Sequence, residues 1–201
     1  MTKPWKIAGG AIAVVLIVLL SCGVYLIVRY KMYYAPSESM APTIRTHQIF
    51  VVDRFAYGGA QPRRNDVVVF TPPIKSENAF FKRVVAVPGD RFAIRGGRTF
   101  VNGKHVDEPF APEPALYELA VRDYDVWVDG ARLDHAVAVI PPRAAWTAPD
   151  TVPPGCYVVL GDNRPNSEDS HVFGFFCPGQ PVPDLPNVHP ELLGRAILPS
   201  R

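Results

Sequence analysis

The chain lacks the composition of a disulfide scaffold and any excess of basic residues in its body. Three cysteines among 201 residues are too few to hold such a scaffold together. Acidic residues are absent from the first 31 positions, which hold Lys3, Lys6, Arg29 and Lys31. The remaining residues carry 17 basic and 19 acidic side chains, so the net charge of +2 comes from the N-terminal segment. A nucleic-acid binder needs a concentrated basic face, so no nucleic acid is expected as a partner.

Long helices are excluded from most of the chain, because its 22 prolines are roughly twice the usual share. Proline interrupts helix interiors, which argues against a helical bundle or a coiled coil. Hydrophobic residues make up 48% of the sequence, and this excludes disorder throughout. A chain of this length forms one domain with embellishments or two small domains.

One long hydrophobic run is present, Ile7–Tyr30, and it has no charge before Arg29. Its first 22 residues would rise about 33 Å as a helix, enough to cross a hydrocarbon core of roughly 30 Å. A cleavable signal peptide has a shorter apolar region, and a buried soluble helix has a polar stripe. The run therefore predicts one transmembrane helix over residues 7–30, after a short N-terminal segment, residues 1–6. Basic residues flank it equally on both sides, so the positive-inside rule gives no orientation.

Beyond the helix, short apolar runs alternate with turn signals, a pattern that is typical of strands. Gly96-Gly97 predicts a tight hairpin turn, and Asn102-Gly103 predicts a second turn. The expected strands are Ile49–Val52, Val67–Thr71, Phe80–Val87, Arg91–Ile94, Thr99–Val101 and Cys156–Leu160. The expected fold is mostly β, with antiparallel sheets.

The segment 108–151 differs from its surroundings in being rich in proline and mixed in polarity. It contains the short alternating pieces Asp123–Val128 and Ala136–Ile140, and it keeps two tryptophans. These features favour a small inserted subdomain over a linker. The main β domain is then expected to combine residues 31–107 with residues 152–201.

Three further segments carry polar residues that are candidates for a catalytic site. Pro36–Thr43 follows the helix and holds two serines, each of which alone would be an ordinary loop hydroxyl. In the run Phe80–Asp90, strand alternation directs Lys82 and Arg83 to opposite faces, so one of them points toward the protein. A buried lysine loses its charge more readily and becomes a base, whereas the alternative is a lysine that reaches the surface. Gly161–Gly174 alone reads as a polar surface turn after a strand.

Together the three segments resemble bacterial type I signal peptidases, the membrane-anchored Ser–Lys endopeptidases of protein export. They match the S-x-S-M-x-P-T, K-R-V-x-x-x-P-G-D and G-D-N-R-x-N-S-x-D-S boxes of that family, in the same order. Asp53-Arg54 and Leu193–Ala196 fit two shorter boxes. The resemblance covers residues 7–105 and 152–197, which leaves the middle segment unmatched. It implies that the main β domain is catalytic and signal-peptidase-like.

The resemblance implies a role for each matching residue. Ser39 corresponds to the nucleophile and Lys82 to the general base. Ser37 would form the oxyanion hole together with the main-chain N–H of Ser39. Ser167 would orient the lysine, and Asp169 would support the site. No metal and no cofactor is implied, and the five histidines are expected to be structural or solvated.

The resemblance also implies partners and a location. The substrates would be membrane-bound preproteins with small residues at positions −1 and −3 of the cleavage site, and the lipid bilayer would be the other partner. The chain would cross the inner (plasma) membrane once, with residues 1–6 in the cytoplasm. The catalytic domain would then lie on the periplasmic or extracytoplasmic side.

Two residues depart from the family pattern, and two cysteines flank the third segment. His171 stands where the family commonly has arginine, so a pair with Asp169 becomes pH-dependent. Pro165 replaces an acidic residue and stiffens the loop. An oxidising compartment would favour a bond between Cys156 and Cys177, but the sequence does not give their distance, so pairing and two free thiols both stay open.

Three alternative functions share some of these features. A peptidase that processes a pilin in conjugative transfer would use the same dyad on another substrate. A self-cleaving Ser–Lys repressor would share the β fold, but it needs no membrane anchor and usually carries a DNA-binding region. A membrane-tethered β domain without activity would not need an intact Ser39 and Lys82.

Overall fold

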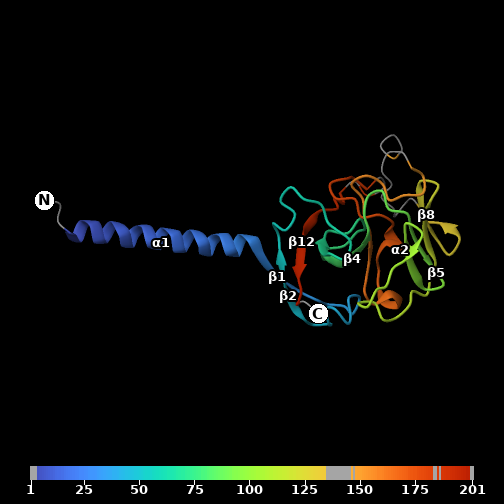
Figure 1. Ribbon diagram of the computed structural model, residues 1–201, viewed down its shortest axis with the longest axis horizontal. Helices are drawn as coiled ribbons and strands as arrows, with labels where there is room; N and C mark the ends of the chain where they lie inside the picture. The colour runs from blue at the N-terminus through green and yellow to red at the C-terminus, as the bar shows by residue number, and fades with distance from the viewer. Residues whose placement is uncertain (1–3, 135–145, 147, 183–184, 186, 200–201) are drawn as a thin grey trace.

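The computed structural model of the chain describes residues 4–134, 146, 148–182, 185 and 187–199. Helix α1, Pro4–Arg29, projects from one end of a β body (Figure 1). Its segment Ile12–Arg29 has a mean hydropathy of 2.6, and none of this segment is buried in the protein. The helix is therefore long and apolar enough to cross a membrane, as expected. It ends one residue earlier than predicted, because Tyr30 already pairs with Asp53 in a sheet.

The described residues of the body form two six-stranded antiparallel sheets, which confirms the mostly β fold. The first sheet has the order β1 (Tyr30–Tyr34), β2 (Ile49–Asp53), β12 (Leu192–Ile197), β3 (Val67–Phe70), β4 (Phe80–Ala86) and β11 (Val158–Leu160). The second has the order β10 (Ala131–Arg132), β9 (Asp125–Val128), β8 (Leu119–Arg122), β5 (Phe92–Arg95), β6 (Arg98–Val101) and β7 (Lys104–His105). Two short helices, η2 (Arg164–Asn166) and α2 (Ser170–Phe173), follow β11.

One hydrophobic cluster of the described residues joins the two sheets, and two others lie around the first sheet. The joining cluster combines Phe92, Ile94 and Leu119 of the second sheet with Val158 and Leu160 of the first. Strands β5, β8 and β9 each direct alternate side chains into this cluster, which is the period that a half-buried sheet requires. The first sheet lies at the helix end of the body, and the second lies at the far end (Figure 1).

Both predicted turns join consecutive strands. Gly96 and Gly97 have φ values of 55° and 72°, and they connect β5 to β6 with Arg95 opposite Arg98. Two positive φ values in sequence are the signature of a two-residue hairpin turn whose twist matches the strands. Asn102 and Gly103, with φ values of 53° and 78°, connect β6 to β7 in the same way.

The segment 108–151 extends the second sheet. Its strand β8 pairs with β5 of the preceding segment, and β9 and β10 continue outward from β8. The alternating piece Asp123–Val128 therefore contains β9, whereas Ala136–Ile140 lies outside the described residues. The division into a catalytic domain and an inserted subdomain stays a prediction.

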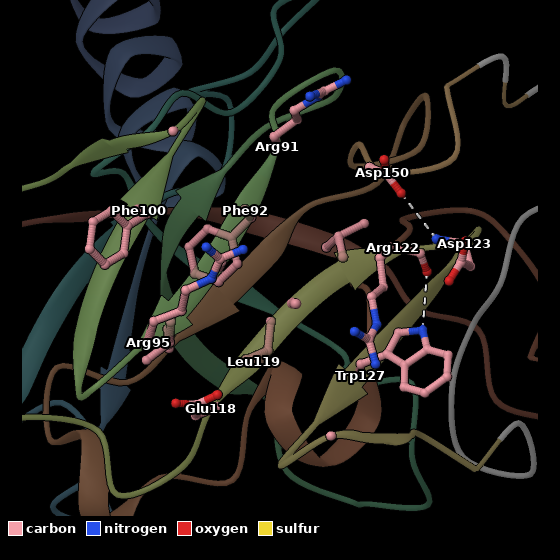
Figure 2. A pocket seen from close by; sticks show the side chains of 16 residues that line it. Arg91, Phe92, Arg95, Phe100, Glu118, Leu119, Arg122, Asp123, Trp127 and Asp150 are labelled. Carbon is pink, nitrogen blue, oxygen red and sulfur yellow. Dashed lines mark hydrogen bonds between the residues drawn. The ribbon is translucent and has the colours of Figure 1, made fainter.

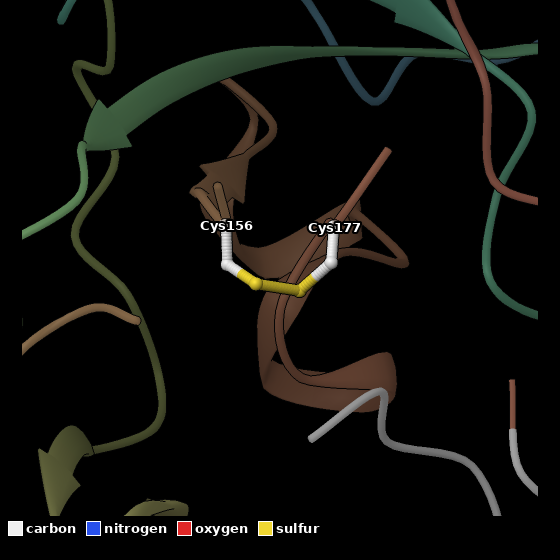
Figure 3. Close-up of a disulfide and its surroundings, with 2 residues drawn as sticks. All are labelled: Cys156 and Cys177. Carbon is white, nitrogen blue, oxygen red and sulfur yellow. A yellow bond between two sulfur atoms is a disulfide. The ribbon is translucent and has the colours of Figure 1, made fainter. Parts of the chain in front are cut away.

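Cys156 and Cys177 form a disulfide, so of the two alternatives pairing is correct (Figure 3). Both residues are fully buried, and their Cα atoms lie 4.2 Å apart. The bond closes the loop that holds Gly161–Gly174 and contributes on the order of 3 kcal/mol in the loop-entropy description. It ties the end of that segment back to the start of β11.

Candidate active site

The two serines of the first motif lie in the turn after β1. The side chains of Met40 and Ile44 are fully buried and anchor this turn in the core. Ser39 is only 6% exposed, and the Ser37 hydroxyl donates to Ser39 Oγ at 3.3 Å. The turn therefore brings both hydroxyls to the same side of the chain.

Lys82 lies in the middle of β4 and is buried. Lys82 is 4% exposed, and its Nζ lies 5.4 Å from the centroid of the Phe80 ring. Burial lowers the pKa of Lys82 to about 8, against the raising influence of the carboxylates of Asp169, Glu168 and Asp162. The alternative of a lysine that reaches the surface is therefore wrong, and a large fraction of the amine is neutral in mildly alkaline solution.

Arg83, the next residue of β4, binds a buried carboxylate. Its Nε and Nη2 donate to the two carboxylate oxygens of Asp162 at 2.8 and 2.5 Å. Its Nη1 donates to the Asn65 carbonyl at 2.8 Å. The sequence predicts one buried basic side chain on β4, but both faces of this strand are covered, so Lys82 and Arg83 are both buried.

Gly161 brings the third motif against Ser39. A Cβ at Gly161 would collide with Ser167 Oγ and with the Ser39 carbonyl oxygen, so a larger residue does not fit. The Asn163 main-chain N–H donates to the same Ser39 carbonyl at 3.1 Å. The loop therefore holds the main chain of Ser39 and places Ser167 beside it.

Asp169 is fully buried and fixes the loop from within. Its Oδ2 accepts a hydrogen bond from the Gly161 N–H at 2.9 Å. Its Oδ1 lies 2.8 Å from His171 Nδ1 and also accepts from the His171 main-chain N–H at the start of α2. The Ser167 hydroxyl is buried and has no hydrogen-bond partner among the described residues, so it is available to a group that enters the site.

The structure thus brings Ser39, Ser167 and Asp169 together around Gly161, and Ser37 joins them through its hydrogen bond to Ser39. The hydrogen bonds of the described residues include none from Lys82 to Ser39 or Ser167. Lys82 is linked to the loop electrostatically, with Asp169 the strongest of the acidic influences on it.

Arg164 and Glu108 also belong to the site, and sequence reasoning missed them. Arg164 is 2% exposed, and its Nε donates to the Gly161 carbonyl at 3.0 Å. Its Nη1 donates to Thr99 Oγ1 at 3.2 Å, and its Nη2 lies 2.8 Å from Glu108 Oε1. The third motif contains Arg164, but no local pattern marks Glu108, which comes from the unmatched segment.

A hollow of about 730 Å³ lies elsewhere, on the outer face of the second sheet (Figure 2). Phe100, Ala93, Ala120 and Trp127 form one row across four strands at its floor. The Arg122 guanidinium lies 4.0 Å from the centroid of the Trp127 ring. The residues that line this hollow include none of the predicted site residues.

Comparison with known proteins gives one family. The model of the family described as signal peptidase, peptidase S26, matches residues 8–182. Signal peptidase I of Leptolyngbya laminosa is 32% identical over 172 residues, which cover 82% of this chain and 66% of that protein. A probable signal peptidase I-2 of Synechocystis sp. is 34% identical over 170 residues, which cover 82% of this chain and 60% of that protein. The chain thus spans less than two thirds of the length of these two relatives.

Signal peptidase I of Bacillus caldolyticus is 35% identical over 148 residues, which cover 73% of this chain and 71% of that protein. Among solved structures, a signal peptidase I from Enterococcus faecalis V583 is 28% identical. The alignment covers 57% of this chain and 88% of that one, with a TM-score of 0.40.

Proposed function

We propose that this chain, which belongs to the signal peptidase family, peptidase S26, is a serine endopeptidase. It removes signal peptides from exported preproteins. The observation that carries the proposal is the buried Lys82, whose pKa of about 8 makes the neutral amine accessible. Lys82 lies on β4, which pairs with β11, and the loop that follows β11 holds Ser39. The buried base thus lies on one strand, and the loop that follows the neighbouring strand contacts the residue that carries the buried hydroxyl.

The reaction is an acyl transfer. Ser39 Oγ attacks the scissile carbonyl carbon, while Lys82 Nζ accepts the hydroxyl proton. The protonated lysine then gives this proton to the leaving amine as the C–N bond breaks, which leaves an ester on Ser39. Water, deprotonated by the same amine, hydrolyses the ester and restores the enzyme.

The remaining site residues stabilise charge and position. The Ser37 hydroxyl and the Ser39 main-chain N–H are the donors for the oxyanion. The unpaired Ser167 hydroxyl orients the amine of Lys82. Asp169 supports the site through its hydrogen bond from Gly161, the residue that lies against Ser39 and Ser167.

The lipid bilayer is the second partner. Besides the helix α1, the strands β1, β2 and β12 next to this helix expose apolar side chains. Met32 of β1 and Ile197 of β12 both pair with Val51 of β2, so the three form a row across the strands. Met32 is 72% exposed and Ile49 is 64% exposed, and Phe55 beyond β2 is also exposed. An apolar face of this kind beside a membrane helix is suited to rest on the bilayer. This contact would hold Ser39 near the surface where signal peptides end.

We place the β body outside the cytoplasm and residues 1–6 inside it, with one crossing of the inner (plasma) membrane. The buried disulfide supports this assignment, because such bonds persist in oxidising compartments. The substrate is then a membrane-bound preprotein with small residues at −1 and −3. Strand β1, which leads to Ser39, pairs with β2 alone among the described strands, so an extended substrate can pair with its other edge.

Cleavage of a panel of preproteins by the full chain in lipid vesicles tests the proposed function. Mass spectrometry of the products should show cuts after small residues at −1 and −3, and none with Ser39→Ala. Cleavage confined to a conjugative pilin precursor would instead support the specialised peptidase. No cleavage of any preprotein by the folded chain would contradict the proposal.

The rate should rise with pH through a midpoint near 8. Lys82 acts only as the neutral amine, and below its pKa of about 8 the amine is protonated, so activity falls as the pH drops. A free lysine, with a pKa of about 10.4, would place the midpoint more than two pH units higher. Measurement of kcat/KM from pH 6 to 11 on one peptide substrate decides between the two.

A further inference from the structure

The connection between β7 and β8, residues 106–118, places three side chains on three basic residues of the site. The Glu108 carboxylate pairs with Arg164, as described above. The Phe110 ring lies under the Arg83 guanidinium, with 3.9 Å between the guanidinium carbon and the ring centroid. The Tyr117 ring stacks on the His171 ring at 4.1 Å, with 13° between their planes.

Each of these three basic residues holds a different residue of the loop 161–169. Arg164 donates to the Gly161 carbonyl. Arg83 binds both carboxylate oxygens of Asp162, and His171 lies against Asp169. The connection thus reaches the loop at three points. It contacts Arg164 of the loop directly, and it contacts Arg83 and His171, which in turn bind the loop.

The connection is built to stay in place. Three prolines among its 13 residues restrict its backbone, and the Ala115 side chain is buried in the core. Pro114 packs so closely on the β5–β6 hairpin that a Cβ at Gly97 would lie 2.8 Å from the Pro114 Cβ. Glu108 and Tyr117 are therefore held at the two ends of a stiff segment.

We propose that Glu108, Phe110 and Tyr117 are positioning residues for peptide-bond cleavage, which act on the catalytic loop through Arg164, Arg83 and His171. This inference rests on the proposed function. The three residues come from the segment that has no counterpart in the family boxes, so the segment would serve the reaction and not only the second sheet.

The physical reason is that the loop controls both halves of the dyad. Gly161 lies against the Ser39 carbonyl, so a displaced loop moves the nucleophile. Asp162 and Asp169 are fully buried, and with Glu168 they are the charged groups that act on Lys82. If the connection loosens, water reaches these carboxylates and weakens their influence on the amine. The burial of Lys82 on β4 should remain, because no hydrogen bond, ion pair or ring contact of the described residues joins the connection to that side chain.

The test uses Phe110→Leu, Tyr117→Leu and Glu108→Gln in the full chain. Each should lower kcat by about tenfold with KM within about twofold of wild type, since a small misplacement of reacting groups is costly. Each should also lower the pKa of Lys82, measured by NMR of ¹⁵N-lysine-labelled protein. A merely structural role would lower the melting temperature but leave kcat and the Lys82 pKa of the folded protein unchanged, and that result would overturn the proposal.

Leu116→Ala serves as the matched control, because it changes a neighbouring side chain that is 79% exposed, and it should have no effect. Tyr117→Phe tests rescue by a conservative variant. It keeps the stacked ring and removes a hydroxyl that has no hydrogen-bond partner among the described residues, so it should restore the activity that Tyr117→Leu loses. If a leucine variant does not fold, Glu108→Gln, which keeps shape and polarity, decides the outcome.

The outcome is distinguishable from failure of the proposed function. If the wild-type chain cleaves no preprotein, the proposed function is wrong. The measurement of the Lys82 pKa needs no substrate, so the comparison of variants with wild type still shows whether the connection acts on the site. If the wild type cleaves and only the three variants differ from the control, both proposals stand.

Discussion

Ser39→Ala and Lys82→Ala are each expected to lower kcat by on the order of 10⁴- to 10⁶-fold, as removal of one member of a catalytic unit does. The first removes the attacking oxygen, and the second removes the base that accepts its proton. Ser39 Oγ receives one weak hydrogen bond, from Ser37, so its loss should leave the turn intact. Lys82→Met fills the volume that alanine leaves empty in β4 and controls for cavity effects. Product analysis by mass spectrometry and thermal unfolding by circular dichroism give activity and folding separately.

The double variant should be little worse than either single one, because the two groups act in one step. Lys82→Arg should also fail, although it keeps a positive charge, because a guanidinium stays protonated and cannot act as a base. An active arginine variant would show that the site uses charge and not basicity. Substantial turnover by folded Ser39→Ala would assign the nucleophile elsewhere.

The strands that could be predicted from the sequence include those buried on both faces, those joined by a marked turn, and β2, a short apolar run that ends at a charged residue. All four residues of β3 are buried, and such a short apolar run has few other stable conformations. Two strands of the first sheet, β1 and β12, were not predicted, and each has a physical reason. Strand β1 has the sequence YKMYY and is half exposed, so it reads equally well as a membrane-interface segment. Strand β12 contains Gly194 and Arg195, and it is stabilised by pairing with β2 and β3, far away in sequence.

The candidate site could be predicted only where a motif marked it. The three boxes point to Ser37, Ser39, Lys82, Ser167 and Asp169. The structure gathers three of them, Ser39, Ser167 and Asp169, around one glycine, and Ser37 bonds to Ser39. The contacts of the 106–118 connection have no such mark. They depend on where a proline-rich segment lies in space relative to a loop that is more than 40 residues away in the sequence. Neither composition nor periodicity gives the position of one segment relative to the other in the fold.

Ser37→Ala is expected to lower kcat on the order of 10²–10³-fold, as loss of one oxyanion-hole donor does. The tetrahedral intermediate carries a full negative charge on oxygen, and the Ser39 N–H alone would leave that oxygen under-solvated. In the structure the Ser37 hydroxyl already points at Ser39 Oγ, 3.3 Å away, which is where the reacting carbonyl must approach. The hydroxyl needs only to exchange one oxygen acceptor for another as the charge develops. Because this interaction is stronger in the transition state than in the ground state, its loss should appear in kcat and not in KM.

The comparison of two substitutions at this position separates a catalytic hydroxyl from an ordinary loop serine. Ser37→Thr keeps the hydroxyl and should retain much of the activity, provided that the added methyl fits beside the Ser39 turn. If Ser37 only fills space in the loop, alanine and threonine should behave alike, and both should remain near the wild-type rate. Determination of kcat and KM for both variants on one peptide substrate distinguishes the two cases. A near-wild-type alanine variant would remove Ser37 from the oxyanion hole and leave the main-chain N–H of Ser39 as the donor to be tested next.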